Sequence, residues 1–140
     1  MATAGYSGTP LWKKLGIKPT NKIFAVNAPG DYATFLQWDV SHQMSTDAES
    51  ADLIHLFAKN RNEFEEEMKL ILPITRENKN INVWVSWYKK SAGIATDLTE
   101  DVIRNFALKN GLIDVKVCAV SDVWSGLKLV VPLALRTKRE

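Results

Sequence analysis

Short apolar runs bounded by turn residues dominate the hydrophobic pattern of this chain. Residues 23–26 and 52–57 are almost continuously apolar, which is typical of strands buried on both faces of a parallel sheet. Residues 81–88 add a third run that is rich in β-branched and aromatic side chains. The pattern therefore predicts three strands, separated by longer polar or amphipathic stretches.

Helical periodicity and capping signals predict two helices between and after these strands. In the first, Asn60 and Glu63 form a capping box, apolar residues follow at helical spacing, and Pro73 is expected to end the helix. The second has Thr99 as its N-cap and Gly111 as its left-handed stop. Helices between strands imply right-handed parallel crossovers.

Weaker signals mark the N-terminal third. Thr9 is expected to cap a short helix, with Pro10 at the first helical position and Gly16 closing it. Residues 32–38 carry a brief helical pattern, and a weak strand is expected near residues 43–44.

The last predicted elements are two strands with no helix between them. Residues 113–120 alternate apolar and polar side chains, a Ser-Asp-Val-Trp-Ser-Gly connection follows, and residues 127–135 are again largely apolar. This pair is expected to add an antiparallel hairpin to the sheet. The sequence thus predicts a single α/β domain over residues 1–140, Rossmann-like, with a mostly parallel sheet, flanking helices and a C-terminal antiparallel hairpin.

Long sequence strings cover nearly the whole chain: GYSGTPLWKKLGIK, VNAP, DLIHLF, WVSWYKK, TDLTEDVIRNFALKNGLIDVKVCAV and SDVWSGLKLV. They resemble a bacterial family of small proteins that is defined as a domain of unknown function, which implies kinship without an activity. Tyr88 stands where this resemblance implies a proline. The order of the predicted elements also resembles a shortened class I S-adenosylmethionine methyltransferase fold, in topology only.

Charge and cysteine content narrow the class of protein. The formal net charge of +2 over 140 residues is too small to imply nucleic-acid binding on electrostatic grounds. One cysteine and two histidines provide neither an internal disulfide nor a metal-site spacing, so no metal site is expected. No cofactor is expected either. No export signal or membrane-length apolar run is present, and we expect a cytoplasmic protein without membrane contact.

The loop after the third predicted strand is the best candidate for ligand binding. Lys89, Lys90 and Ser91 leave the strand end together, and Thr96 and Asp97 follow before the last helix. Lysine acts as a point charge for phosphate or carboxylate, and hydroxyl groups orient such an anion. The loop is therefore a candidate anion site, although a solvated turn that leads into a capped helix is the plainer interpretation.

The loop after the first strand is a second place where an open parallel sheet would bind a ligand. Methyltransferase-like enzymes carry a glycine-rich turn there, whereas this chain has Asn27, Ala28 and Pro29 followed by one glycine. Because Pro29 has no N–H group, the turn lacks a donor that a cofactor needs. Asn27 is retained as a candidate ligand contact.

Three other side chains have both a chemical and a structural interpretation. His55 is expected to be a core histidine with satisfied hydrogen bonds rather than a base, and Cys118 a small buried residue. Trp124 is expected to cover the edge of the core rather than to stack on a ligand. Residues 6–9 and the basic tail with Arg136, Lys138 and Arg139 are weaker candidates for anion contact, and the plainer interpretations are helix capping by Thr9 and a solvated tail. No catalytic residue is assigned.

The leading hypothesis is a non-catalytic or degenerate methyltransferase-like domain that binds a small anionic ligand or a protein partner through its strand-end loops. An S-adenosylmethionine-dependent methyltransferase is one alternative. A structural or interaction protein is the other, forming a homodimer through the edge of the terminal hairpin, because a free sheet edge can pair with another chain.

Overall fold

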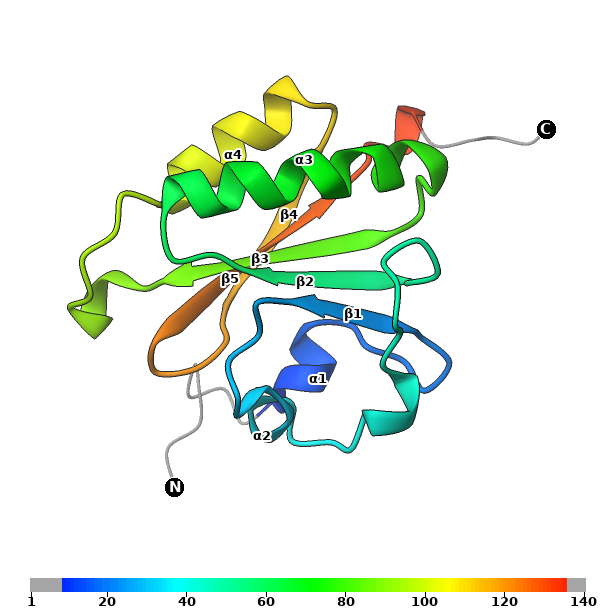
Figure 1. The fold of residues 1–140 in the computed structure, drawn as a ribbon, viewed down its shortest axis with the longest axis horizontal. Coiled ribbons are helices and arrows are strands. Elements are labelled where there is room, and N and C mark those ends of the chain that lie inside the picture. The colour runs from blue at the N-terminus through cyan, green and yellow to red at the C-terminus, as the bar shows by residue number, and fades with distance from the viewer. Residues whose placement is uncertain (1–8, 136–140) are drawn as a thin grey trace.

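Five strands form one sheet in the computed structural model, which describes residues 9–135 (Figure 1). The strands are β1 (Ile23–Val26), β2 (Leu53–Phe57), β3 (Asn82–Tyr88), β4 (Ile113–Ala119) and β5 (Trp124–Val130). Their order across the sheet is β1-β2-β3-β5-β4. The first three are parallel, and β5 lies antiparallel between β3 and β4. The predicted Rossmann-like, mostly parallel sheet with a terminal antiparallel hairpin is therefore confirmed.

Helices cover both faces of this sheet (Figure 1). On one face lie α3 (Arg61–Glu77) and α4 (Glu100–Lys109), and on the other lie α1 (Leu11–Lys14) and α2 (Tyr32–Leu36). A separate apolar cluster fills the space between each helical layer and the sheet. Burying both faces explains why β2 is apolar along almost its whole length. Within residues 9–135, no helix has both the length and the apolar character that a membrane crossing requires.

The chain changes direction across the sheet after β1. Met44 forms an isolated parallel bridge with Ile23, and Ile23 also pairs with Leu53 of β2. Met44 and β2 must therefore lie on opposite sides of β1. The weak strand expected near residues 43–44 is reduced to this single bridge, yet the bridge makes the carboxyl ends of β1 and β2 a topological switch point.

The helix α3 continues through Pro73, so the prediction that this proline ends the helix is wrong. The N-terminal cap of α3 agrees with the sequence-based prediction, because the Asn60 side chain accepts a hydrogen bond from the Glu63 N–H at 2.8 Å. Beyond the proline, Ile74 and Thr75 are buried in the core. Their packing holds the last turn in spite of the backbone hydrogen bond that Pro73 cannot donate.

Replacing Pro73 by alanine is expected to raise the free energy of unfolding by about 1–2 kcal/mol. Alanine restores an N–H donor inside the helix, and part of this gain is offset because proline also restricts the unfolded chain. Pro73 is exposed, so the core is unchanged. Urea denaturation measures the effect, with Lys69→Ala, another exposed position of α3, as the control. A variant no more stable than the wild type would contradict this prediction.

Two other predicted boundaries are wrong by a few residues. Pro10 is the N-cap of α1 rather than its first helical residue, because its ψ of 152° is extended; the cap is therefore not Thr9. Gly16 closes the helix with a φ of 78°, as predicted. In the terminal hairpin, β5 begins at Trp124, because residues 120–123 alone are enough to turn the chain, and it ends at Val130 rather than at residue 135, since residues 133–135 form a short 3-10 turn.

The strand β4 is a free edge of the sheet, whereas β5 is enclosed. Val115 and Val117 on β4 are 51% and 53% exposed. The register shifts between Asp114 and Lys116, which makes a β-bulge at this edge. Bulges and lysines are common devices against edge-to-edge pairing. The homodimer through the hairpin edge stays a prediction, and β4 is the hairpin strand available to it.

Candidate functional site

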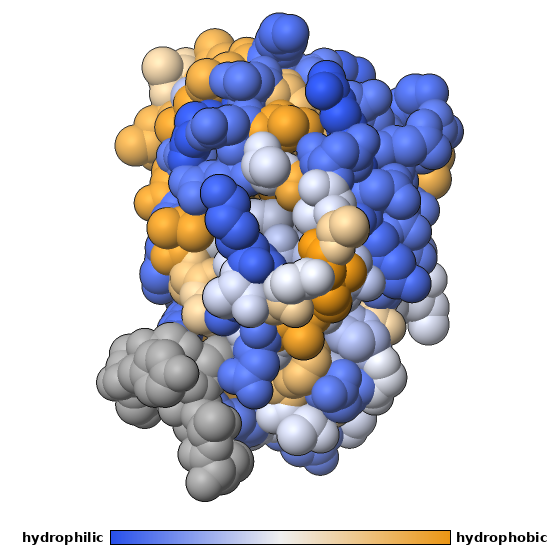
Figure 2. Space-filling model, turned by 90° about the vertical axis from the view of Figure 1, so that its left-hand side faces the viewer, coloured by the Kyte–Doolittle hydropathy of each residue, from blue (hydrophilic) through white to orange (hydrophobic). Residues whose placement is uncertain are grey.

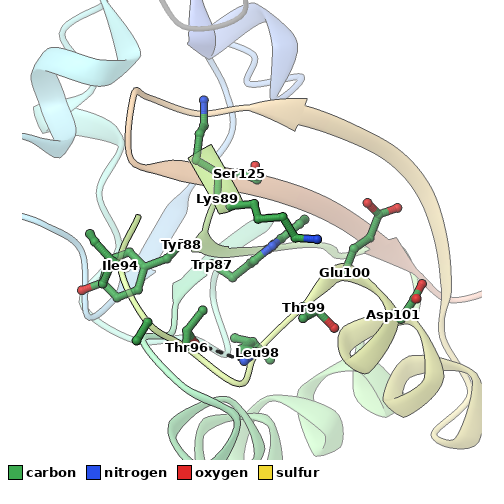
Figure 3. Close-up of a pocket in the computed structure, with 12 residues that line it drawn as sticks. Trp87, Tyr88, Lys89, Ile94, Thr96, Leu98, Thr99, Glu100, Asp101 and Ser125 are labelled. Carbon is green, nitrogen blue, oxygen red and sulfur yellow. Dashed lines mark hydrogen bonds between the residues drawn. The ribbon is translucent and has the colours of Figure 1, made fainter. Parts of the chain in front are cut away.

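A cleft of about 620 Å³ opens at the carboxyl end of β3, beside the start of α4. Hydrophilic residues predominate on this end of the molecule, with apolar residues between them (Figure 2). The close-up in Figure 3 shows side chains from β3, the following loop and α4 around the cleft. Its lining combines Trp87, Tyr88, Ile94, Ala95 and Leu98 with the polar Lys89, Lys90, Thr96, Thr99, Glu100, Asp101 and Ser125. Size and lining suit a small organic molecule.

Two predicted ligand residues fasten the loop that forms one wall of the cleft. The Thr96 hydroxyl donates to the carbonyl oxygen of Lys59 at 2.8 Å and accepts from the Leu98 N–H at 3.1 Å. The Asp97 carboxylate accepts from the Arg61 N–H at 2.8 Å. Both side chains tie the loop to the turn between β2 and α3. Thr96 also lines the cleft, whereas Asp97 does not, so their observed role is to hold the wall in place.

Lys89 and Lys90 bring two positive charges to the cleft, and neither forms a salt bridge with any residue in the range 9–135. Together with Thr96 they are the predicted site residues that the structure assembles. Ser91 lies in the exposed turn η3 (Lys90–Ala92) outside the lining. Asn27 follows β1 in a left-handed conformation with a φ of 57° and also lies outside this cleft.

A second charged group stands at the start of α4. Arg104 donates to Asp101 at 2.8 Å, to Asp114 at 3.1 Å and, at close range, to Glu100. Hydrogen bonds to Asp114 and Glu100 raise the pKa of the Arg104 guanidinium. The Arg104 guanidinium thus forms ion pairs with three carboxylates, of which those of Glu100 and Asp101 line the cleft. The cleft therefore carries charges of both signs.

A buried polar chain crosses three elements on the opposite face of the sheet. His55 Nδ1 hydrogen-bonds with the Tyr32 hydroxyl at 3.0 Å, and its Nε2 hydrogen-bonds with the Ser86 hydroxyl at 2.7 Å. Burial lowers the pKa of His55 to about 3 and raises that of Tyr32 above its ordinary value. The ring is therefore neutral near pH 7. This is the satisfied core histidine that the sequence predicts, and it is inaccessible to a substrate.

The remaining candidates also have structural roles. Trp124 is 7% exposed and stacks on Tyr88, with 4.6 Å between ring centroids, so it covers the edge of the core. Cys118 is half-buried rather than buried as predicted, and this partial burial raises the pKa of its thiol. Within the part of the chain that the structure describes, no group of three or more His, Cys, Asp or Glu side chains gathers as a metal site would require. Residues 6–8 and 136–139 lie outside the described residues.

Among the cleft residues that sequence reasoning did not identify are Trp87, Glu100 and Ser125. Strand alternation contains a signal for Trp87, because it lies two residues before Lys89 and therefore on the same face. The position of Glu100 directly after the helix cap is a weaker signal. No sequence signal marks Ser125, because its place beside the cleft depends on the pairing of β5 with β3, in which Ser125 is opposite Trp87.

Comparison with known proteins identifies no family and no function for this chain. No protein-family model matches the chain, and no curated protein does. Among solved structures, the chain is similar to a protein in the NADB-Rossmann superfamily from Streptococcus agalactiae, with 10% sequence identity and a TM-score of 0.48. The similar region covers 94% of this chain and 70% of that protein.

Proposed function

We propose that this chain is a non-catalytic, methyltransferase-like binding domain that holds a small ligand with an anionic group in the cleft at the end of β3. The observation that carries the proposal is the placement of Lys89 and Lys90 on a cleft of about 620 Å³, without a salt bridge among the described residues. Volumes of this order are typical of ligand sites.

The walls of the cleft support a preformed site. Thr96 and Asp97 anchor one loop by hydrogen bonds to the backbone, and Leu98 is 1% exposed beneath it. A rigid wall lowers the conformational entropy that a ligand must overcome on binding. Aromatic and apolar side chains would remove the ligand from water, and the two ammonium groups would fix its anionic end.

The test is a thermal-shift screen followed by calorimetry with inorganic phosphate, nucleotides, phosphorylated metabolites and the common amino acids. Lys89→Ala is expected to weaken binding of a responding ligand about tenfold, because hydrogen bonds to charged groups contribute about 1.5–3 kcal/mol. Lys22→Ala removes an exposed lysine outside the cleft and is the matched control. A screen without any response, or binding equally strong in Lys89→Ala and Lys90→Ala, would exclude the proposed function.

Methyl transfer from S-adenosylmethionine is the second candidate, and the switch point between β1 and β2 favours it. The turn after β1 disfavours it, because Pro29 donates no hydrogen bond there. Inclusion of S-adenosylmethionine in the same screen separates the two. Binding that depends on Asn27 and not on Lys89 would favour the enzyme.

A further inference from the structure

The indole N–H of Trp87 faces the cleft without a hydrogen-bond partner among the described residues. The Trp87 residue is 7% exposed, and its ring lies at the base of the cleft (Figure 3). By contrast, the N–H of the fully buried Trp84 donates to the carbonyl oxygen of Leu15 at 3.1 Å. A buried tryptophan normally finds an acceptor for this group. The Trp87 nitrogen is not itself fully buried, so the acceptor of a bound molecule can reach it from the cleft.

Other donors converge on the same part of the cleft. Lys89 follows β3 directly in an extended conformation, two residues after Trp87, and both residues line the cleft beside α4. Ser125 is paired directly with Trp87 on the neighbouring strand and also lines the cleft. An indole N–H, an ammonium group and a hydroxyl are all donors of the kind that an oxyanion accepts hydrogen bonds from.

The opposite wall carries the reverse charge. Glu100 and Asp101 lie across the cleft from Trp87 and Lys89, at the start of α4 (Figure 3). Each accepts one hydrogen bond from Arg104, whereas a carboxylate has about four acceptor positions. The Asp101 side chain is 84% exposed. Acceptor capacity is therefore available here for a cationic or hydrogen-bond-donating group of a ligand.

We propose that the ligand is a zwitterion of the α-amino acid class, with its carboxylate on Trp87 and Lys89 and its ammonium group facing Glu100 and Asp101. This inference rests on the proposed function and specifies the ligand of the same site. Two lysines and two carboxylates in one lining give no net charge, which matches a zwitterion better than a phosphate dianion. The apolar wall formed by Leu98 and its neighbours is available to the ligand's side chain.

Two-dimensional ¹H–¹⁵N spectra test this directly, because each indole N–H gives its own resonance. The twenty common L-amino acids serve as probes, and the Trp87 resonance is assigned from its loss in Trp87→Phe. An amino acid that binds is expected to move the Trp87 resonance and leave that of Trp84 in place. If Trp87→Phe fails to fold, substitution of the other four tryptophans assigns the resonance instead.

Matched analogues test the two ends of the ligand. For the amino acid that binds most tightly, the deaminated acid and the decarboxylated amine are each expected to bind about tenfold more weakly. The double variant Glu100→Gln/Asp101→Asn is expected to weaken binding of the amino acid and not of the deaminated acid. An acid that binds as tightly as its amino acid, or a Trp87 resonance that no amino acid moves, would overturn the inference. Phosphate binding that depends on Lys89 with an unmoved Trp87 resonance would overturn it while leaving the proposed function standing.

Discussion

Lowering the pH from 7 to 4.5 is expected to reduce the free energy of unfolding by about 3 kcal/mol through His55 alone. The pKa of His55 is about 3 in the folded protein because burial disfavours the charged ring, and about 6.5 in the unfolded chain. Between these values the unfolded chain binds more protons, so stability is fully present above pH 6.5 and is lost as the pH falls toward 3. Urea denaturation at a series of pH values measures this loss.

His55→Gln is the variant that isolates this effect, because glutamine keeps a donor and an acceptor between Tyr32 and Ser86 and does not titrate. Its free energy of unfolding is expected to vary less with pH than that of the wild type, since both share the same carboxylates. His42→Gln, at an exposed histidine, is the matched control for the loss of an imidazole ring. Identical slopes for the wild type and His55→Gln would show that the buried ring does not carry the dependence.

Elements marked by strong local signals are the ones that the sequence predicts correctly. The Asn60 cap and the Thr99 cap are both present, with their side chains accepting from Glu63 and Val102 at 2.8 and 3.3 Å. Pro73 shows the limit of such local rules. A proline disfavours a helix interior, but burial of the residues beyond it outweighs the loss of one hydrogen bond, and no local pattern reports how those residues pack.

The buried polar chain shows a second limit. Alternation places His55 on one face of β2 and Ser86 on one face of β3, but their contact depends on the register between the strands. In that register His55 pairs with Trp84, which leaves Ser86 as its diagonal neighbour. Tyr32 comes from α2, which docks on the sheet through tertiary contacts alone. Sequence reasoning therefore identified the histidine and not its partners.

Some residues of the candidate site could be predicted from the sequence, and others are recognised only in the structure. Two adjacent lysines after an apolar strand are visible in the sequence, and the structure places Lys89 and Lys90 on the cleft. A tryptophan in an apolar strand is ordinary, and only the structure distinguishes Trp87, which lines the cleft without a hydrogen-bond partner among the described residues, from the fully buried and hydrogen-bonded Trp84. Acidic residues in a first helical turn, such as Glu100, are likewise ordinary because they suit the helix dipole. The position of Glu100 across the cleft from Lys89 is a consequence of the tertiary fold.

Replacing Gly126 by alanine is expected to lower the free energy of unfolding by about 2 kcal/mol, the usual cost of overfilling a core. A Cβ at this position would lie 3.0 Å from Cγ2 of Val120, 3.3 Å from Cε3 of Trp84 and 3.5 Å from Oγ of Ser86. Trp84 is fully buried, so its ring has no space into which it can move at low cost. Gly30→Ala is the matched control, because a Cβ there meets nothing within 4 Å. Urea midpoints compare the two variants, and equal stability would mean that β5 shifts enough to accept the methyl group.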